Sequence, residues 1–157
     1  MSDKAVVFDI DGVLADSFWR GHYIWKKKPD WEGFFEACPN DPPQALAAMP
    51  AILEDAGYTL FYVTCRPEWN REKTEAWLIE HLGDVKRPRP IMRPDDIGKT
   101  NWGDGDTWKV NVIRDLAEKH DVHFIFEDCP TIIIRLRALK LPVVPILSGY
   151  YPWRVPR

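Results

Sequence analysis

Unbroken runs of apolar residues recur along the chain, and each run ends in a polar or charged residue. Runs without apolar–polar alternation are typical of strands that are buried on both faces, as in a parallel sheet covered by helices. The pattern predicts five such strands, at residues 5–8, 58–63, 90–92, 123–126 and 142–147.

Segments with apolar residues at helical spacing lie between these strands. They predict helices at residues 44–56, 70–82, 107–120 and 130–139. Gly57 and Gly83 follow the first two where helices commonly end, and Pro130 opens the fourth, where proline is favoured. Pro50 lies inside the first segment and predicts a kink or a restart there. The alternation indicates an α/β fold with a five-stranded parallel, Rossmann-like sheet and helices on both faces.

One long segment, residues 15–43, departs from the alternation because it separates the first strand from its helix. We expect a single domain over residues 1–157, with 15–43 as a small cap-like insertion. Since this insertion is short, we expect a fairly open cleft that suits a substrate larger than the site.

The charge balance limits how the chain could bind nucleic acid. It has 21 Lys and Arg against 24 Asp and Glu, which gives a net charge of −3. Binding through bulk positive charge is therefore excluded, and any contact requires a local basic patch. The 8 Trp residues are unusually many for 157 residues and suggest a binding surface in addition to a core.

Cysteine usage indicates a reducing compartment, and hydropathy predicts neither a secretory signal nor a membrane-spanning segment. Cys38, Cys65 and Cys129 are widely spaced and form no zinc-binding pattern, so we expect reduced thiols without a disulfide partner. The short apolar run after Lys4 ends in Asp9, unlike a secretory signal, and no apolar window is long enough to span a membrane. We therefore expect a cytoplasmic protein that does not bind membranes.

Polar side chains follow four of the predicted strands, and carboxyl ends of parallel strands form the ligand crevice of such sheets. In chain order these are Asp9, Asp11 and Gly12, then Thr64, Cys65 and Arg66, then Arg93, then Glu127 and Asp128. Four carboxylates at one edge repel one another unless a cation lies between them. Because oxygen ligands on a small site favour Mg²⁺, the sequence predicts a magnesium site.

The segment Asp9–Leu14 together with Thr64, Lys109 and the pair Glu127-Asp128 resembles the four ordered motifs of the haloacid dehalogenase (HAD) superfamily. The resemblance implies that Asp9 accepts a phosphoryl group as nucleophile and that Asp11 is the general acid and base. It implies that Thr64 and Lys109 hold the phosphoryl oxygens. Lys99 is the alternative candidate for the role of Lys109. Lys109 starts the helix that leads to the fourth strand, which is where the family places this lysine.

The same resemblance implies a Mg²⁺ site made by Asp9, Asp11, Asp128 and Glu127. Asp11 would contribute its backbone carbonyl. We expect Asp128 to be the direct ligand, with Glu127 adjacent or bridging through water. The residue types suit the chemistry, because a carboxylate attacks phosphorus without prior deprotonation and the +2 spacing puts Asp11 on the same side of the strand end as Asp9.

Several further segments resemble the phosphatase domain of phage-type polynucleotide kinase, which removes 3′-phosphates from DNA or RNA ends. They are residues 64–68, 71–82, 92–93 and 105–109, then 127–128 with Arg135, and 148–149. Thr64-Cys65 stands where that family commonly has Ser-Gly, and Glu127 where Asp is usual. No GxxxxGK[ST] motif occurs, so we expect no kinase activity.

This resemblance implies 3′-phosphorylated DNA or RNA ends as the substrate. It implies that Arg66 and Arg93 contact the terminal phosphate or the neighbouring backbone, that Gly12 and Cys65 take part in substrate binding, and that Asp106 supports Lys109. Separate end-healing modules of this kind suggest the cytoplasm of a bacterial or phage-infected cell.

The insertion interleaves aromatic and basic residues on what we expect to be a surface patch: Trp19-Arg20, Tyr23, Trp25 with the lysines at 26–28, and Trp31. Such rings either stack on nucleobases or form a small aromatic core that fastens the insertion, and the sequence leaves both open. A second basic stretch is expected near the mouth of the cleft and consists of Lys86, Arg87, Arg89 and Arg93.

Two other functions remain open from the sequence. The same site could serve a small-molecule phosphatase such as a 5′(3′)-nucleotidase. It could also belong to a non-catalytic phosphate-binding module or a receiver-like domain that stores phosphate on Asp9, although the second carboxylate of Asp11 favours hydrolysis. DNA or RNA preference, activity on 2′,3′-cyclic phosphate and oligomeric state stay open.

Overall fold

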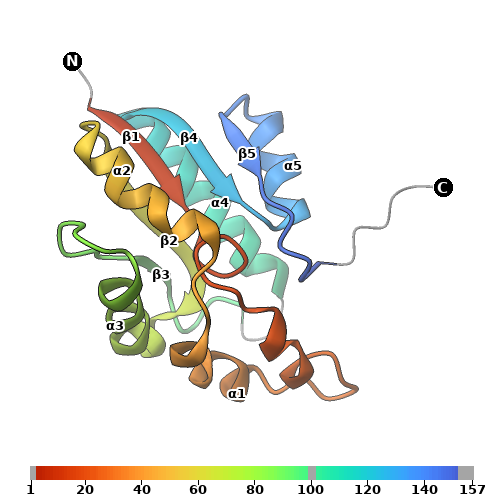
Figure 1. Cartoon of the computed structure of the whole chain (residues 1–157). Coiled ribbons are helices and arrows are strands. Elements are labelled where there is room, and N and C mark those ends of the chain that lie inside the picture. Colours follow the sequence, from red (N-terminus) through yellow and green to blue (C-terminus); the bar gives the residue numbers. More distant parts are fainter. Residues whose placement is uncertain (1–2, 99–101, 152–157) are drawn as a thin grey trace.

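A computed structural model describes residues 3–98 and 102–151 and shows a five-stranded sheet in which each strand is parallel to its neighbours (Figure 1). The strand order is β3-β2-β1-β4-β5. The predicted α/β fold is confirmed. The strands are β1 (Lys4–Phe8), β2 (Thr59–Pro67), β3 (Ile91–Arg93), β4 (Asp121–Glu127) and β5 (Val143–Pro145).

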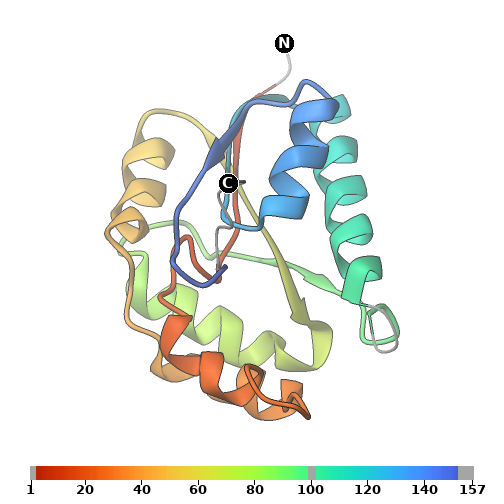
Figure 2. The ribbon, with the colours of Figure 1, turned by 90° about the vertical axis from the view of Figure 1, so that its right-hand side faces the viewer.

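Helices cover both faces of the sheet, as the turned view shows (Figure 2). Leu53 of α2 (Met49–Asp55) and Trp77 of α3 (Arg71–His81) pack with Val6 and Phe8 of β1. On the opposite face, α4 (Trp102–Lys119) and α5 (Pro130–Ala138) pack around Val7. Successive residues of β1 therefore point into two different cores, which is why its sequence shows no apolar–polar alternation.

Two helices differ from the predicted ranges. The segment predicted at 44–56 is a 3₁₀ turn at Ala45–Ala48 followed by α2, with Pro50 in the first turn of α2. Proline lacks the N–H that a continuing helix needs, so the helix restarts there. Helix α4 begins at Trp102 rather than at residue 107, and the weak helix former glycine at 103 and 105 concealed this first turn.

The insertion at residues 15–43 contains a 3₁₀ turn (Phe18–Tyr23), helix α1 (Trp31–Glu36) and a second 3₁₀ turn (Cys38–Asn40). Its two ends meet, because Ala15 bridges both to Asp11 and to Pro43. The Nε1–H of Trp77 in α3 donates to the Asp41 carbonyl at 2.9 Å, which fastens the end of the insertion to the domain. Its use as a cap stays a prediction.

The expectation that Lys86, Arg87 and Arg89 lie at the mouth of the cleft is wrong, whereas Arg93 of the same stretch lines a pocket at the ends of β2 and β3. The other three line a surface hollow with Glu54, Gly57 and the first residues of β2. Since this loop enters the parallel strand β3, it must lie at the amino edge of the sheet, opposite the edge where β1 and β4 end. Within residues 3–98 and 102–151, no helix combines the length and the apolarity needed to cross a membrane.

Candidate active site

Three carboxylates meet where the neighbouring strands β1 and β4 end. Asp9 follows β1, and Glu127 and Asp128 close β4, whose Phe126 pairs with Phe8. All three side chains are buried, and one oxygen of each lies within 4.8 Å of the others. The predicted convergence of these acids is therefore present in the structure.

Helix α4 inserts the buried ammonium of Lys109 into this acidic cluster. Its Nζ lies 2.7 Å from Asp9 Oδ1 and 2.7 Å from Glu127 Oε2. Burial alone would lower the pKa of Lys109, but these two carboxylates raise it well above its usual value, so the ammonium stays charged. The competing Lys99 lies outside the described residues.

One ammonium does not balance three carboxylates. Burial, together with the neighbouring Glu127, raises the pKa of Asp9 well above its usual value and that of Asp128 to about 7. Such shifts mark a site that lacks positive charge. The donor atoms are all oxygens on buried carboxylates, so the residues fit a hard divalent cation such as Mg²⁺.

Glu127 is engaged through both of its oxygens. Its Oε1 accepts hydrogen bonds from the backbone N–H groups of Asp128, at 3.1 Å, and Cys129, at 3.0 Å, while Oε2 faces Lys109. Glu127 therefore fixes both the turn after β4 and the position of the ammonium.

Gly12 lies directly beside the Asp128 carboxylate. Its φ of +77° is a left-handed conformation that glycine adopts without strain. A Cβ at this position would lie 2.0 Å from Asp128 Oδ2, well inside contact distance. In this structure the glycine therefore leaves room for a carboxylate of the acidic cluster.

Asp11 has a different environment from Asp9, two residues away. Its Oδ1 lies 2.6 Å from Arg20 Nη2 and 2.7 Å from Arg66 Nη2, and Asp41 joins both arginines. Burial alone would raise the pKa of Asp11, but Arg66 and Arg20 lower it far below its usual value. Its side chain is thus an ionised carboxylate outside the acidic cluster.

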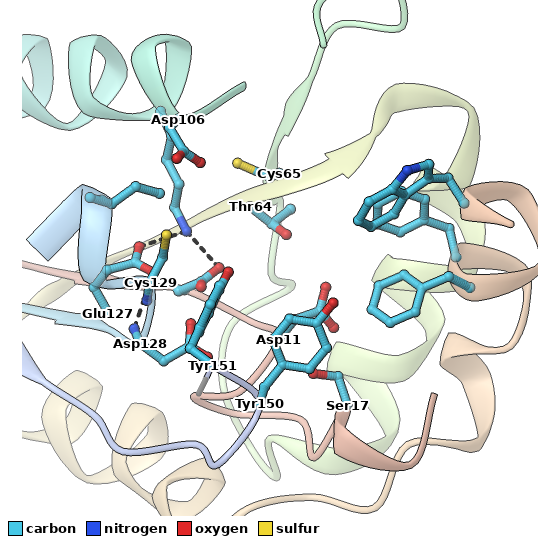
Figure 3. Close-up of a pocket in the computed structure, with 16 residues that line it drawn as sticks. Asp11, Ser17, Thr64, Cys65, Asp106, Glu127, Asp128, Cys129, Tyr150 and Tyr151 are labelled. Atoms are coloured by element: carbon cyan, nitrogen blue, oxygen red, sulfur yellow. Dashed lines mark hydrogen bonds and ion pairs between the residues drawn. The ribbon is translucent and has the colours of Figure 1, made fainter. Parts of the chain in front are cut away.

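These side chains surround one pocket of about 60 Å³ (Figure 3). The six residues predicted for catalysis or metal binding all line it: Asp9, Asp11, Thr64, Lys109, Glu127 and Asp128. In the view of Figure 3, Thr64 and Asp11 lie across the pocket from Glu127 and Asp128. Trp31, Phe34 and Phe35 of α1 form part of the pocket wall, so the cleft is narrower here than the short insertion predicted.

The predicted substrate-binding residues are distributed differently. Cys65 lines the pocket, and its thiol lies 3.7 Å from the Gly105 carbonyl. Arg66 is fully buried on Asp11 and Asp41 and is absent from the described lining of this pocket. Arg93 lines an adjoining pocket, and its Nε donates to the Cys65 carbonyl at 2.9 Å.

Several residues of the site had no predicted role. Ser17, Cys129, Tyr150 and Tyr151 also line the pocket. Arg20, which the sequence placed in an aromatic and basic surface patch, is fully buried, with its guanidinium carbon 4.2 Å from the centre of the Phe34 ring. The one available signal was the rule that a buried charge requires a partner, here Asp41, 21 residues further along the chain.

The tryptophans of the insertion make structural contacts. Trp19 Nε1 donates to Asp41 Oδ1 at 2.9 Å, and Trp25 packs edge-on against Phe18 with ring centres 5.2 Å apart. Trp31 stacks near Phe35 and lines the pocket. The aromatic core exists, while Trp19 and Trp25 keep 38% and 53% of their surface exposed, so stacking on a ligand stays open for them.

Comparisons with known proteins agree with this architecture. A Bacillus cereus protein provisionally named as a nucleotidase is 25% identical over 130 residues, which cover 83% of this chain and 60% of that protein. A chain of the Pnkp1/Rnl/Hen1 RNA repair complex superposes with a TM-score of 0.70 at 20% identity, over 92% of this chain and 42% of that one. The class C acid phosphatase of Bacillus anthracis with tungstate bound gives a TM-score of 0.60 at 12% identity, over 96% and 69% of the two chains.

The two structural matches share the fold, and this chain spans well under two thirds of the nucleotidase relative and of the repair-complex chain. The family match is more extensive, because residues 3–151 match the family described as the polynucleotide kinase PNKP phosphatase domain. Those residues include every member of the site described above. The chain therefore belongs to the PNKP phosphatase-domain family of the HAD superfamily.

Proposed function

We propose that this chain is a Mg²⁺-dependent phosphomonoesterase that removes 3′-phosphates from nucleic-acid ends through a phosphorylated Asp9. One observation carries the proposal. The Asp9 carboxylate lies at a pocket that also contains the Lys109 ammonium, the Thr64 hydroxyl and a cluster of metal-binding carboxylates. A nucleophile, donors to phosphoryl oxygens and a cation site are the groups that phosphoryl transfer requires.

Mg²⁺ would be held by Asp9 and Asp128, with the Asp11 carbonyl as a further ligand and Glu127 beside it. The contacts of Glu127 to Lys109 and to two backbone N–H groups favour Asp128 as the direct ligand. When bound, Mg²⁺ would screen the repulsion between the Asp9 carboxylate and the phosphate dianion.

In the first step, an Asp9 oxygen attacks phosphorus, the P–O bond to the 3′ oxygen breaks, and the leaving oxygen takes up a proton. In the second step, water attacks the phosphorylated Asp9, and its proton passes to the Asp11 carboxylate. Inorganic phosphate and the free Asp9 carboxylate are released. Throughout, Lys109 and Thr64 donate to the non-bridging oxygens of the phosphoryl group.

Asp11 is the residue that donates the proton of the first step and accepts the proton of the second. In the arrangement seen here its lowered pKa keeps it ionised and makes it a weak base. Both steps therefore require weaker contacts with Arg20 and Arg66 when substrate is bound. We infer that residues 15–43, which carry Arg20, act as a small cap that tunes this acid.

Nucleic-acid ends are favoured as substrate by the family match and by the fold shared with an RNA repair complex. The second candidate is a nucleotidase, which the Bacillus cereus relative and the small volume of the pocket favour. All three cysteines are free thiols, which is compatible with work in the cytoplasm of a bacterial or phage-infected cell.

A substrate panel separates the two candidates. The purified chain is assayed with Mg²⁺ or with EDTA on 3′-phosphorylated and 5′-phosphorylated oligonucleotides, a 3′-nucleoside monophosphate and p-nitrophenyl phosphate. DNA, RNA and 2′,3′-cyclic ends are included. We expect Mg²⁺-dependent turnover with the highest kcat/KM on a 3′-phosphorylated oligonucleotide. Preference for the monophosphate would establish the nucleotidase, and absence of turnover on every ester would overturn both.

Two variants test the assigned chemistry. Asp9→Asn and Asp11→Asn should each remove nearly all phosphatase activity while the thermal unfolding transition stays cooperative. The matched control is Asp115→Asn on the exposed side of α4, where Asp115 contacts only Arg114 among the described ion pairs. Full activity of either active-site variant contradicts the assignment.

A further inference from the structure

A second pocket adjoins the first one at the carboxyl edge of the sheet. Its volume is about 420 Å³, which is within the range of sites that hold small organic ligands. Three aromatic rings and an arginine dominate its lining, with two carboxylates at the side: Trp31, Phe35, Trp69, Arg93, Glu32 and Asp95.

The two pockets share walls and are joined by one strand. Trp31 and Phe35 line both of them. Thr64 lines the first pocket and Pro67, at the end of the same strand β2, lines the second. Three residues of extended strand span about 10 Å, so a group in the second pocket can be covalently linked to a phosphate in the first.

The rings form a connected aromatic surface. Trp31 and Phe35 are stacked at 27° with ring centres 6.2 Å apart, and Phe35 meets Trp69 edge-on at 6.3 Å. Trp69 keeps 47% of its surface exposed, although it lies in a 3₁₀ turn whose backbone is fixed by a 3.0 Å hydrogen bond from its N–H to Asp95 Oδ1. A large ring held in place and left half exposed is available to stack on a flat partner.

The charges of this pocket favour a nucleobase over a backbone phosphate. The carboxylates of Glu32 and Asp95 repel a phosphate, whereas they can accept hydrogen bonds from the amino groups of adenine, cytosine or guanine. Arg93 forms a fixed wall of this pocket, because its Nε donates to the Cys65 carbonyl and its Nη1 to the Ile97 carbonyl.

We propose that the second pocket is a subsite for the base of the 3′-terminal nucleotide, which stacks on Trp69 and Trp31 while its 3′-phosphate lies beside Asp9. This inference rests on the proposed 3′-phosphatase function. It implies that the terminal base leaves the stack of a duplex, so single-stranded or frayed ends are the preferred substrates.

The test compares two 3′-phosphorylated oligonucleotides that differ only in the terminal base, which is present in one and replaced by an abasic residue in the other. For the wild type we expect kcat/KM to fall at least about fivefold on the abasic end, the fold-change that corresponds to about 1 kcal/mol of lost stacking. Trp69→Ala should lose the same factor on the normal end and no longer distinguish the two ends.

Three controls separate a binding role from a structural one. Trp69→Phe keeps a stacking ring and should recover most of the discrimination. Phe124→Ala removes a half-exposed ring of β4 outside both pockets and should behave as the wild type. Turnover of glycerol 2-phosphate, which has no ring that could stack, should be equal in all of these proteins.

The outcomes distinguish this inference from the proposed function. If the wild type hydrolyses both oligonucleotides equally well, or if Trp69→Ala still discriminates between them, the base subsite is refuted and the 3′-phosphatase stands. If the wild type hydrolyses p-nitrophenyl phosphate but neither oligonucleotide, the proposed function itself fails.

Discussion

The guanidinium of Arg20 reaches from the insertion to the Asp11 carboxylate, with Nη2 and Oδ1 2.6 Å apart. Arg20 also donates to both oxygens of Asp41 and to the Phe34 carbonyl, so a single fully buried side chain joins the strand end to two parts of the insertion. The arrangement connects the stability of the insertion to the protonation state of the proposed acid–base residue.

Replacing Arg20 should therefore change both stability and catalysis. Arg20→Ala leaves the buried Asp41 without its main partner, and breaking a buried ion pair in this way costs about 3–5 kcal/mol. We expect a clear drop in the urea midpoint. Since one of the two cations that lower the pKa of Asp11 is lost, the alkaline limb of kcat/KM, where Asp11 loses the proton that it donates in the first step, should also move to higher pH.

Arg114→Ala is the matched control, because Arg114 pairs with Asp115 on the exposed surface of α4. Its urea midpoint and pH profile should equal those of the wild type. An Arg20→Ala protein with an unchanged urea midpoint would show that the buried network contributes nothing to folding. An unchanged alkaline limb would show that Asp11 does not set the profile.

The contact between Gly12 and the Asp128 carboxylate gives a second prediction, about the Mg²⁺ requirement. Gly12→Ala places a methyl group 2.0 Å from Asp128 Oδ2 and in a left-handed conformation. We expect the carboxylate to be displaced, so a Mg²⁺ titration of phosphatase activity should require a several-fold higher concentration and give a lower maximum. Gly57→Ala is the control, since Gly57 has a similar φ of +86° but no atom within 4 Å of the added methyl.

Both alanine variants bear the cost of a left-handed residue, about 1–2 kcal/mol. Gly57→Ala should lose about that much stability, and Gly12→Ala more, because its methyl group also displaces the Asp128 carboxylate. Only the Gly12 variant should lose activity at low Mg²⁺, and equal activity of both variants would separate Asp128 from the metal site.

The sequence was sufficient to predict the acidic cluster because a parallel sheet brings the carboxyl ends of its strands to one edge. The meeting of Asp9, Glu127 and Asp128 could be predicted from the ends of two apolar runs alone. The basic residues at 86–89 follow the same rule in reverse: they precede a parallel strand and so lie at the other edge. The prediction failed there because charge was considered without the direction of the chain.

The arginines show what local sequence does not reveal. Arg20 and Arg66 are ordinary basic residues in sequence, yet both are fully buried and paired with Asp11 and Asp41. These partners are separated by up to 55 residues. The pairing of β1 with β2 brings Arg66 to Asp11, and the packing of the insertion against α3 holds Asp41 in place. The position of Trp31 in the pocket wall likewise depends on where α1 packs, which the local sequence does not reveal.

Cys65 should react slowly in the folded protein. Burial raises the pKa of its thiol far above the usual value even though Lys109 opposes this, so the reactive thiolate is scarce at neutral pH. We expect iodoacetamide to leave activity nearly unchanged at pH 7.5 and to label Cys65 only after unfolding, as measured by peptide mass spectrometry. Rapid labelling of Cys65 in the native protein, with loss of activity, would contradict the raised pKa of its thiol.

The raised pKa values of Asp9 and Asp128 predict how stability depends on pH and metal. In the unfolded chain these carboxyls have pKa values near 3.9, whereas the pKa of Asp128 in the folded protein is about 7. Between those values the folded state binds more protons than the unfolded state, so stability falls as pH rises from about 4 to 7. In EDTA, the melting temperature at pH 5.5 should therefore exceed that at pH 7.5.

Mg²⁺ should reverse this trend, because it binds the deprotonated cluster and stabilises only the folded chain. We expect the increase in melting temperature on adding Mg²⁺ to be larger at pH 7.5 than at pH 5.5, as measured by differential scanning fluorimetry. Asp128→Asn is the informative variant: it removes one buried charge, so the EDTA sample should melt at a higher temperature at pH 7.5 and respond weakly to Mg²⁺. A variant that loses stability in EDTA at pH 7.5 and still gains the full Mg²⁺ response would place the cation elsewhere.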